Sequence, residues 1–317
     1  MSMKKSTLFL ALAIGTTTAF AQDLTSKKGE PYLPEAGDWA ISFDATPFLN
    51  YAGNLFSGST AQNVAPTANW TNANQMTIVG KYFKDEKTAY RAIVRLGFDS
   101  NKQVGEITDA TSVGTINFPA LRPQKEDDVK LRHHYVGVGV GLEKRRGKTR
   151  LQGYYGADAM IWTTGQSAKY DYGNTLAASG TTPVTVNGAT TTNFGINPVL
   201  ANFNGVANNL VNDSYGNPAR ITSATVGQTF GIGLRAFIGA EYFIFPKISI
   251  GAEYGFGFGF STTGNSSYST ESVGGTPASV GTQTILVKRT SAIGLDNDLN
   301  GGGSGTGSGA IKLTLHF

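Results

Sequence analysis

The chain has 317 residues, a formal net charge of +4 and no cysteine. Without cysteine it has no disulfide bond, thiolate metal site or cysteine nucleophile. Charged residues make up only 15% of the chain. They form no basic stripe, so no nucleic-acid partner is expected. The 41 glycines lack the three-residue repeat of collagen, which excludes a triple helix.

Residues 1–21 have the three parts of a secretory signal peptide. Lys4 and Lys5 form a basic start, residues 8–14 an apolar core, and the letters AFA ending at Ala21 a cleavage site. The apolar core is far shorter than the roughly 20 residues of a membrane-spanning helix. Removing the two lysines leaves 24 basic and 22 acidic residues. We therefore expect an exported protein whose residues 22–37 form an irregular periplasmic lead.

The clearest pattern lies in residues 225–262, where two runs alternate with period two around a short turn, as in a β-hairpin. One face of both runs is continuously apolar. The opposite face is mostly glycine, with Arg235 and Glu253 among the few charges. A soluble sheet buries its apolar face, whereas a transmembrane barrel turns that face to lipid and its small or charged residues inward. The pattern favours the barrel.

Similar alternation recurs along the chain and predicts eight strands. They cover residues 38–50, 75–83, 88–99, 128–143, 149–163, 225–243, 247–262 and 306–317. Short turns between them alternate with long polar stretches such as 164–224. Long loops disfavour a compact soluble domain, but outer-membrane barrels combine short periplasmic turns with long extracellular loops. The predicted fold is all-β: an eight-stranded antiparallel transmembrane β-barrel over residues 38–317.

The chain ends in IKLTLHF, in which Leu313, Leu315 and Phe317 alternate on one face. Together with the signal peptide and the eight strands, this ending resembles the small bacterial outer-membrane β-barrel families of the porin type, such as the OmpA transmembrane domain, OmpX and OmpW-like proteins. The resemblance implies that the barrel-assembly machinery recognises these three residues. Leu315 departs from the family pattern, which has an aromatic residue there. The loop composition resembles exported proteins of the Bacteroidota.

An eight-stranded barrel is about wide enough for its own side chains, so inward charges should be paired. The candidates for such lumen ion pairs are Arg235, Glu253, Glu143, Arg150, Arg91, Arg95, Asp44 and Asp158. The turns predict that Arg235 lies diagonally from Glu253, Glu143 near Arg150, Tyr135 near Asp158, and Gly139 opposite Tyr154. Lys81 should oppose Arg91. Such a network is either an ionic plug that stabilises the barrel or the lining of a narrow polar path.

Residues 296–301 read DNDLNG and match the first half of a calcium-binding loop through Asp296, Asp298 and Asn300. The closing glutamate is missing, because Gly307 occupies its position. Calcium is therefore the one cofactor considered, and a solvated turn is the alternative.

His133 and His134 are candidates for a lipid-modifying site at the outer rim, but no serine completes a catalytic set with them, and we expect no enzyme. Arg122, Lys125, Lys130 and Arg132 form a basic cluster that would attract lipopolysaccharide phosphates, or would be a solvated loop.

The sequence thus predicts an integral protein of the bacterial outer membrane with a structural or interaction role. It would display large surface loops, as a possible subunit of a larger assembly. Its partners would be outer-membrane lipid and lipopolysaccharide, the barrel-assembly machinery and other outer-membrane proteins. The alternatives are a small porin-like conduit for small or hydrophobic solutes and, third, a lipid-modifying enzyme.

Overall fold

The computed structural model describes residues 24–45, 78–112, 115–116, 118–179, 183–287, 289–297 and 310–317. The predicted signal peptide lies outside these residues. Within them the chain is all-β, and its helical segments are two short 3-10 turns, η2 (Ala110–Ser112) and η3 (Leu200–Asn202). No helix of the described part is long and apolar enough to cross a membrane.

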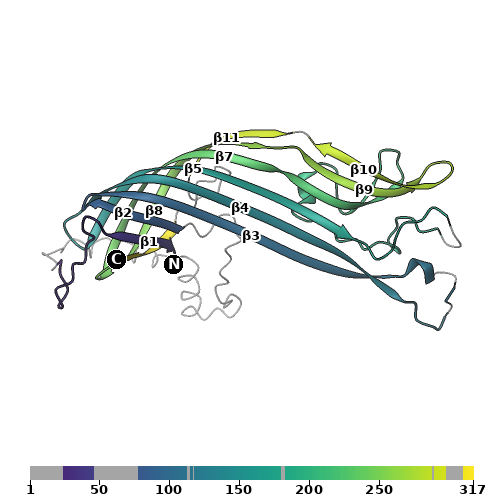
Figure 1. Cartoon of the computed structure of the whole chain (residues 1–317), viewed down its shortest axis with the longest axis horizontal. Helices are drawn as coiled ribbons and strands as arrows, with labels where there is room; N and C mark the ends of the chain where they lie inside the picture. Colours follow the sequence, from purple (N-terminus) through teal and green to yellow (C-terminus); the bar gives the residue numbers. More distant parts are fainter. Residues whose placement is uncertain are drawn as a thin grey trace, which may run out of the picture.

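Twelve strands of the described chain form one antiparallel sheet (Figure 1). They are β1 (Trp39–Asp44), β2 (Ile78–Asp85), β3 (Thr88–Thr108), β4 (Gln124–Arg146), β5 (Leu151–Asp171), β6 (Leu210–Asn212), β7 (Pro218–Phe245), β8 (Ile248–Thr263), β9 (Ser266–Gly274), β10 (Ser279–Val287), β11 (Thr290–Asn297) and β12 (Ala310–His316).

Eight of these strands pair in a ring, in the order β1-β2-β3-β4-β5-β7-β8-β12 and back to β1. The ring closes where β12 runs antiparallel to β1. There the backbone N–H of Trp39 donates to the carbonyl of Phe317 at 2.8 Å, and the N–H of Phe317 returns a bond to Trp39 at 2.9 Å. The closure leaves no unpaired edge at this level of the sheet, which matters because free strand edges invite aggregation.

Each of the eight predicted strand ranges overlaps one strand of the ring. Short turns connect β2 to β3, β4 to β5 and β7 to β8, and all three lie at the end of the ring where β12 meets the start of β1. We call this end the turn end. The predicted positions 46–50, 75–77 and 306–309 lie outside the described residues.

Several strands extend well beyond their predicted bounds, away from the turn end (Figure 1). β3 continues to Thr108, β5 continues to Asp171, and β7 begins at Pro218. Parts of the predicted loops 100–127 and 164–224 are therefore strand. The segment between the last two predicted strands contains β9, β10 and β11, which the sequence pattern did not predict as strands of the ring.

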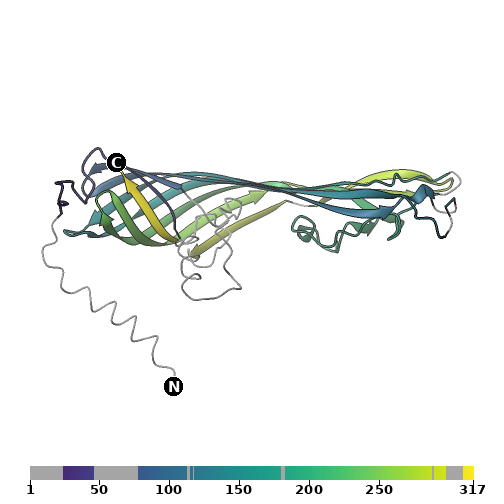
Figure 2. The same ribbon diagram turned by 90° about the horizontal axis from the view of Figure 1, so that it is seen from below.

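These extensions, together with β9 and β10, form what we call the distal sheet: residues 99–108, 124–133, 164–171, 218–228, 266–274 and 279–287. Residues 172–179 and 183–217 cover one face of it (Figure 2). A hydrophobic cluster joins the two layers, with Val129 and Tyr170 from the sheet and Leu200 and Phe203 from the cover. The cover is also held by Asp127, which accepts backbone N–H groups at 2.7 and 2.9 Å.

Side chains alternate strictly between the two faces of the ring. Outward residues are apolar and exposed, among them Val140 (67%), Leu234 (62%) and Ile238 (64%). Inward neighbours such as Glu143 and Arg235 are buried. This is the alternation predicted from the sequence, with apolar residues outside the ring and charged residues inside it.

Candidate functional site: the charged interior of the ring

The interior of the ring near its turn end holds a network of buried ion pairs. Among the side chains that the structure describes, every strand of the ring except β1 contributes at least one to it. Its members are Lys81, Arg91, Glu143, Arg145, Asp158, Arg235, Glu241, Glu253 and Lys312. Five cations therefore meet four carboxylates, and the group is close to neutral. Their side chains are at most 5% exposed, except for Lys312 at 13%.

Glu253 on β8 binds three cations. Its carboxylate accepts Arg91 Nη1 at 2.9 Å, Arg235 Nη1 at 2.7 Å and Lys312 Nζ at 2.8 Å. The three donors come from β3, β7 and β12, so one carboxylate ties together strands from opposite sides of the ring. Buried charge is costly unless it is paired and hydrogen-bonded, and Glu253 meets both conditions.

Glu143 on β4 forms the second centre. Lys81 Nζ lies 2.8 Å from its carboxylate, Arg145 Nη1 2.9 Å and Arg91 Nη1 3.3 Å. Arg145 also donates to Glu241 on β7. Arg91 is thus shared between Glu143 and Glu253 and joins the two centres.

Asp158 on β5 completes the network between Arg91 and Arg235. Its Oδ2 accepts Arg235 Nη1 at 3.2 Å. Its Oδ1 lies 3.3 Å from Arg91 Nε, an ion-pair distance without hydrogen-bond geometry. The Arg91 guanidinium also lies on the ring of Phe237, 3.9 Å from its centre. Such cation–π contact adds stabilisation that grows when the pair is away from water.

Apolar side chains fill the interior on both sides of the network. Toward the turn end, Phe83 and Phe243 are fully buried and pack on the His316 ring. Toward the distal sheet, an inward cluster consists of Val79, Ile93, Tyr135, Met160 and Trp162. Trp162 lies directly against Gly231, where any side chain would collide with the indole. The described part of the interior is therefore packed with side chains.

The predicted pair Arg235 and Glu253 lies within this network, and Lys81 is directly opposite Arg91 in the strand register. Asp44 is on β1, but its side chain is outside what the structure describes. Arg95 makes no ion pair with the described residues. Its guanidinium carbon lies 4.5 Å over the ring of Tyr135 instead.

Three predicted contacts need correction, and they share one cause. β4 continues to Arg146, into the turn predicted at residues 144–148, which moves the register between β4 and β5. Glu143 therefore faces Gly156 rather than Arg150. Arg150 lies outside the network and stacks on Tyr32, 3.6 Å from the ring centre.

The same register places Tyr135 opposite Thr164, so Tyr135 does not meet Asp158. It also pairs Gly139 with Met160. Tyr154 instead lies over Gly239 on β7, where a Cβ atom would collide with the tyrosine ring. A glycine does make room for this tyrosine, but on the other neighbouring strand.

Sequence reasoning missed three members of the network. Arg145 falls between two predicted strands, and Glu241 and Lys312 fall within predicted strands but were given no partner. The spacing Glu143-x-Arg145 carried a usable signal, because two residues apart on a strand point to the same side.

The two other candidate sites are the histidine pair and the calcium loop. Neither is joined to a catalytic or metal-binding group of side chains among the described residues. His133 Nε2 lies 3.2 Å from Thr164 Oγ1, and His134 Nε2 contacts the Gln228 amide. Asp298 and Asn300 lie outside the described residues, as does the side chain of Asp296. No group of three His, Cys, Asp or Glu in the described residues is placed to hold a metal.

Comparison with known proteins gives no relative: no protein-family model, no curated protein and no solved structure matches this chain. Function must therefore be argued from the chain itself.

Proposed function

We propose that this protein is an integral outer-membrane protein, in which the closed ring is an eight-stranded transmembrane β-barrel. The observation that carries the proposal is a reversal of polarity along the same strands. On β4, Val138 and Val140 point outward while Glu143 points inward. In the distal sheet the same strand turns Val129 inward and Lys130 outward. The outward face of a strand that passes from lipid into water would change from apolar to charged in this way.

The height of the apolar band supports the same proposal. On β5 the outward residues from Leu151 to Ile161 span ten residues. At about 3.3 Å per residue and a tilt of about 40°, this corresponds to roughly 25 Å, the height of the lipid-facing band of such barrels.

Aromatic side chains border the apolar band at the turn end. Trp39, Tyr82 and Tyr90 lie side by side on adjacent strands and are exposed. The rings of Trp39 and Tyr82 are 4.9 Å apart. At the other border Phe98 and Phe230 are exposed. Aromatic girdles at both interfaces are typical of transmembrane barrels.

Within this proposal the role is structural or interactive. The ionic network and the apolar layers beside it occupy the described interior, which disfavours the porin-like conduit. The strands instead support a distal sheet with its own hydrophobic core, which would stand on the cell surface. Other outer-membrane proteins are the proposed partners of that surface. Leu313 and Leu315 on β12, and Phe317 directly after it, would be recognised by the barrel-assembly machinery.

Two experiments test the proposal. The unboiled protein should migrate faster on a denaturing gel than the boiled protein, and it should stay in the membrane fraction after carbonate extraction. A soluble protein without a heat-dependent shift would refute it. In planar bilayers the closed interior predicts no stable conductance steps. Regular steps that scale with salt would favour the conduit.

A further inference from the structure

The outward face of β3, β4 and β5 carries a basic band just above the apolar band. Lys102, Lys130 and Lys169 stand directly opposite one another on three neighbouring strands. Opposed side chains in such rows are about 4.5–5.5 Å apart, and like charges there are unfavourable. Nearby negative charge is therefore needed to offset the repulsion among these three lysines.

The protein supplies only part of that charge. Lys102 binds Asp128 at 3.0 Å, and Lys169 binds Asp171 at 2.9 Å. Lys130 makes no ion pair with the described residues. Arg132, one step closer to the apolar band, likewise makes none and lies between Ser100 and Ser167. Within this band, four cations and two carboxylates leave an excess of two positive charges.

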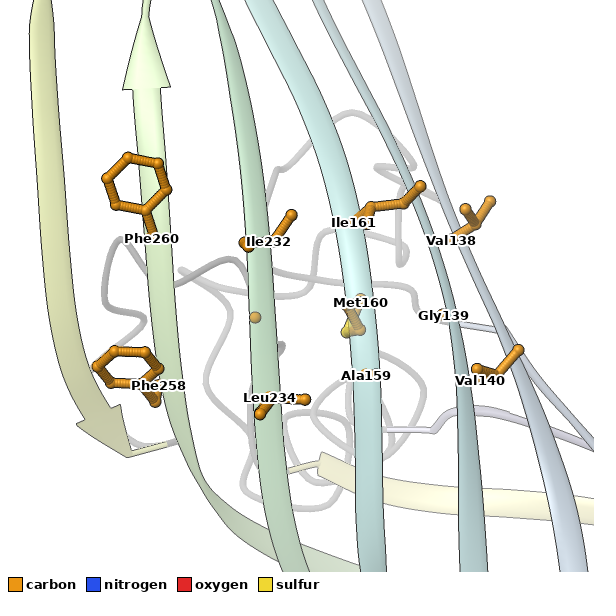
Figure 3. A pocket seen from close by; sticks show the side chains of 11 residues that line it. Val138, Gly139, Val140, Ala159, Met160, Ile161, Ile232, Leu234, Phe258 and Phe260 are labelled. Atoms are coloured by element: carbon orange, nitrogen blue, oxygen red, sulfur yellow. The ribbon is translucent and has the colours of Figure 1, made fainter.

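An apolar groove of about 560 Å³ lies below this basic band on the same outer surface (Figure 3). Ala159 lies between the larger Val140 and Leu234 in one row across the sheet, and Phe258 follows on β8. The small alanine side chain leaves the depression that its neighbours border. The groove runs across β4, β5, β7 and β8, and apolar side chains line nearly all of it.

The spacing between groove and cations matches the dimensions of a lipid. Val138 at the groove and Arg132 are six residues apart on β4, which is about 20 Å along the strand or about 15 Å in depth at a tilt of about 40°. Half of a hydrocarbon core of about 30 Å is also about 15 Å. Between the two lie polar groups suited to a headgroup border: His134 and Thr163, which both contact Gln228.

We propose that this surface is a binding site for one phosphorylated glycolipid of the outer leaflet, with its phosphates on Lys130 and Arg132 and an acyl chain in the groove at Ala159. The inference rests on the proposed outer-membrane location. It goes further, because it names one face of the barrel and one class of lipid. Charge decides for this occupant, because a neutral lipid would leave the positive charges of Lys130 and Arg132 without an anionic partner among the described residues. Glu106 and Glu126 lie opposite one another, farther from the apolar band than the lysines. Their negative charges repel phosphate, so a phosphate is held at the level of the lysines.

The test compares the binding of two lipids with the same acyl chains to the detergent-solubilised full-length barrel by native mass spectrometry. One is the bis-phosphorylated glucosamine disaccharide lipid, and the other is its dephosphorylated form. We expect the phosphorylated lipid to bind more tightly. The double variant Lys130→Gln/Arg132→Gln should weaken its binding about 25-fold, at about fivefold per charge removed. The variant Lys144→Gln/Lys148→Gln removes the same charge at the turn end and should leave binding unchanged.

The groove is tested separately with Ala159→Leu, which fills the depression and should weaken binding of both lipids. Equal affinity for the two lipids, or an unchanged affinity of the Lys130/Arg132 variant, would overturn the inference. Displacement of the lipid by millimolar inorganic phosphate would also overturn it, because the patch would then be a simple anion site. Each sample is first checked for heat-dependent gel migration. A protein without that shift would contradict the proposed barrel, whereas a barrel without lipid preference would contradict this inference alone.

Discussion

Replacing Glu253 with glutamine should destabilise the ring strongly, because it removes one charge from a buried network without changing side-chain volume. The side chain of Glu253 is 1% exposed, and three cations lie within 2.9 Å of its carboxylate. Arg91 and Arg235 would keep Asp158 as a partner. Lys312, however, would lose its one ion pair to the described residues. Breaking a buried pair from one side costs about 3–5 kcal/mol, and the remaining contacts favour the lower end, about 3 kcal/mol.

The assay is reversible unfolding in guanidinium chloride in lipid vesicles, followed by tryptophan fluorescence. The matched control is Glu106→Gln, on the exposed part of β3, which should change the free energy of unfolding by less than about 0.5 kcal/mol. Adding Lys312→Met to Glu253→Gln should restore part of the loss, because the unpaired cation is then removed as well. If Glu253→Gln behaved like the control, the carboxylate would be solvated. The interior would then be a water-filled path rather than a packed layer.

Two further predictions concern the packing of the ring and the distal turn. Gly239→Val should destabilise the ring by about 1–3 kcal/mol, since the new side chain meets Tyr154. Gly281→Ala, with open space around it, should be neutral in the same unfolding assay. At the β6–β7 turn, hydrogen bonds led by the Asn217 side chain lower the pKa of Asp213 from 3.8 to about 2. A lowered carboxyl pKa stabilises the folded turn above pH 3.8, and that contribution is lost as the pH falls through about 2. Hydrogen exchange of the turn amides should rise over that range, beyond the intrinsic rate change, and Asp213→Asn should abolish the rise; a pH-independent wild type would refute the assignment.

The sequence allowed the outward face of the ring to be predicted because period two is a local property. Leu234 and Ile238 could be assigned to it without knowing any partner strand. The pair Arg235 and Glu253 could also be placed, since a short turn fixes the register of the hairpin that contains both. The register between β4 and β5 could not be predicted, because the end of β4 was misplaced by three residues, which shifts every pair. Arg145 was lost from the network for that reason.

The distal sheet escaped prediction for a different physical reason. On β5 its alternation is regular, with Tyr170 inward and Lys169 outward, but its sense is opposite to that of the ring wall. A search for outward apolar residues therefore ends near Ile161 and assigns the remainder to loop. The segment that covers the sheet has no periodic pattern, and its position depends on single contacts such as the backbone bonds to Asp127.

The central claim is that the ring stands in lipid with its apolar face outward. The natural chain has no cysteine, so single cysteines can be introduced along β7 and spin-labelled without background. In lipid vesicles, labels at the outward positions 232, 234 and 238 should be relaxed by oxygen and protected from a water-soluble nickel reagent. A label at the exposed position 225, on the distal part of the same strand, should instead be relaxed by the nickel reagent. A strong nickel effect at the outward positions would show that this face meets water, and would contradict the account.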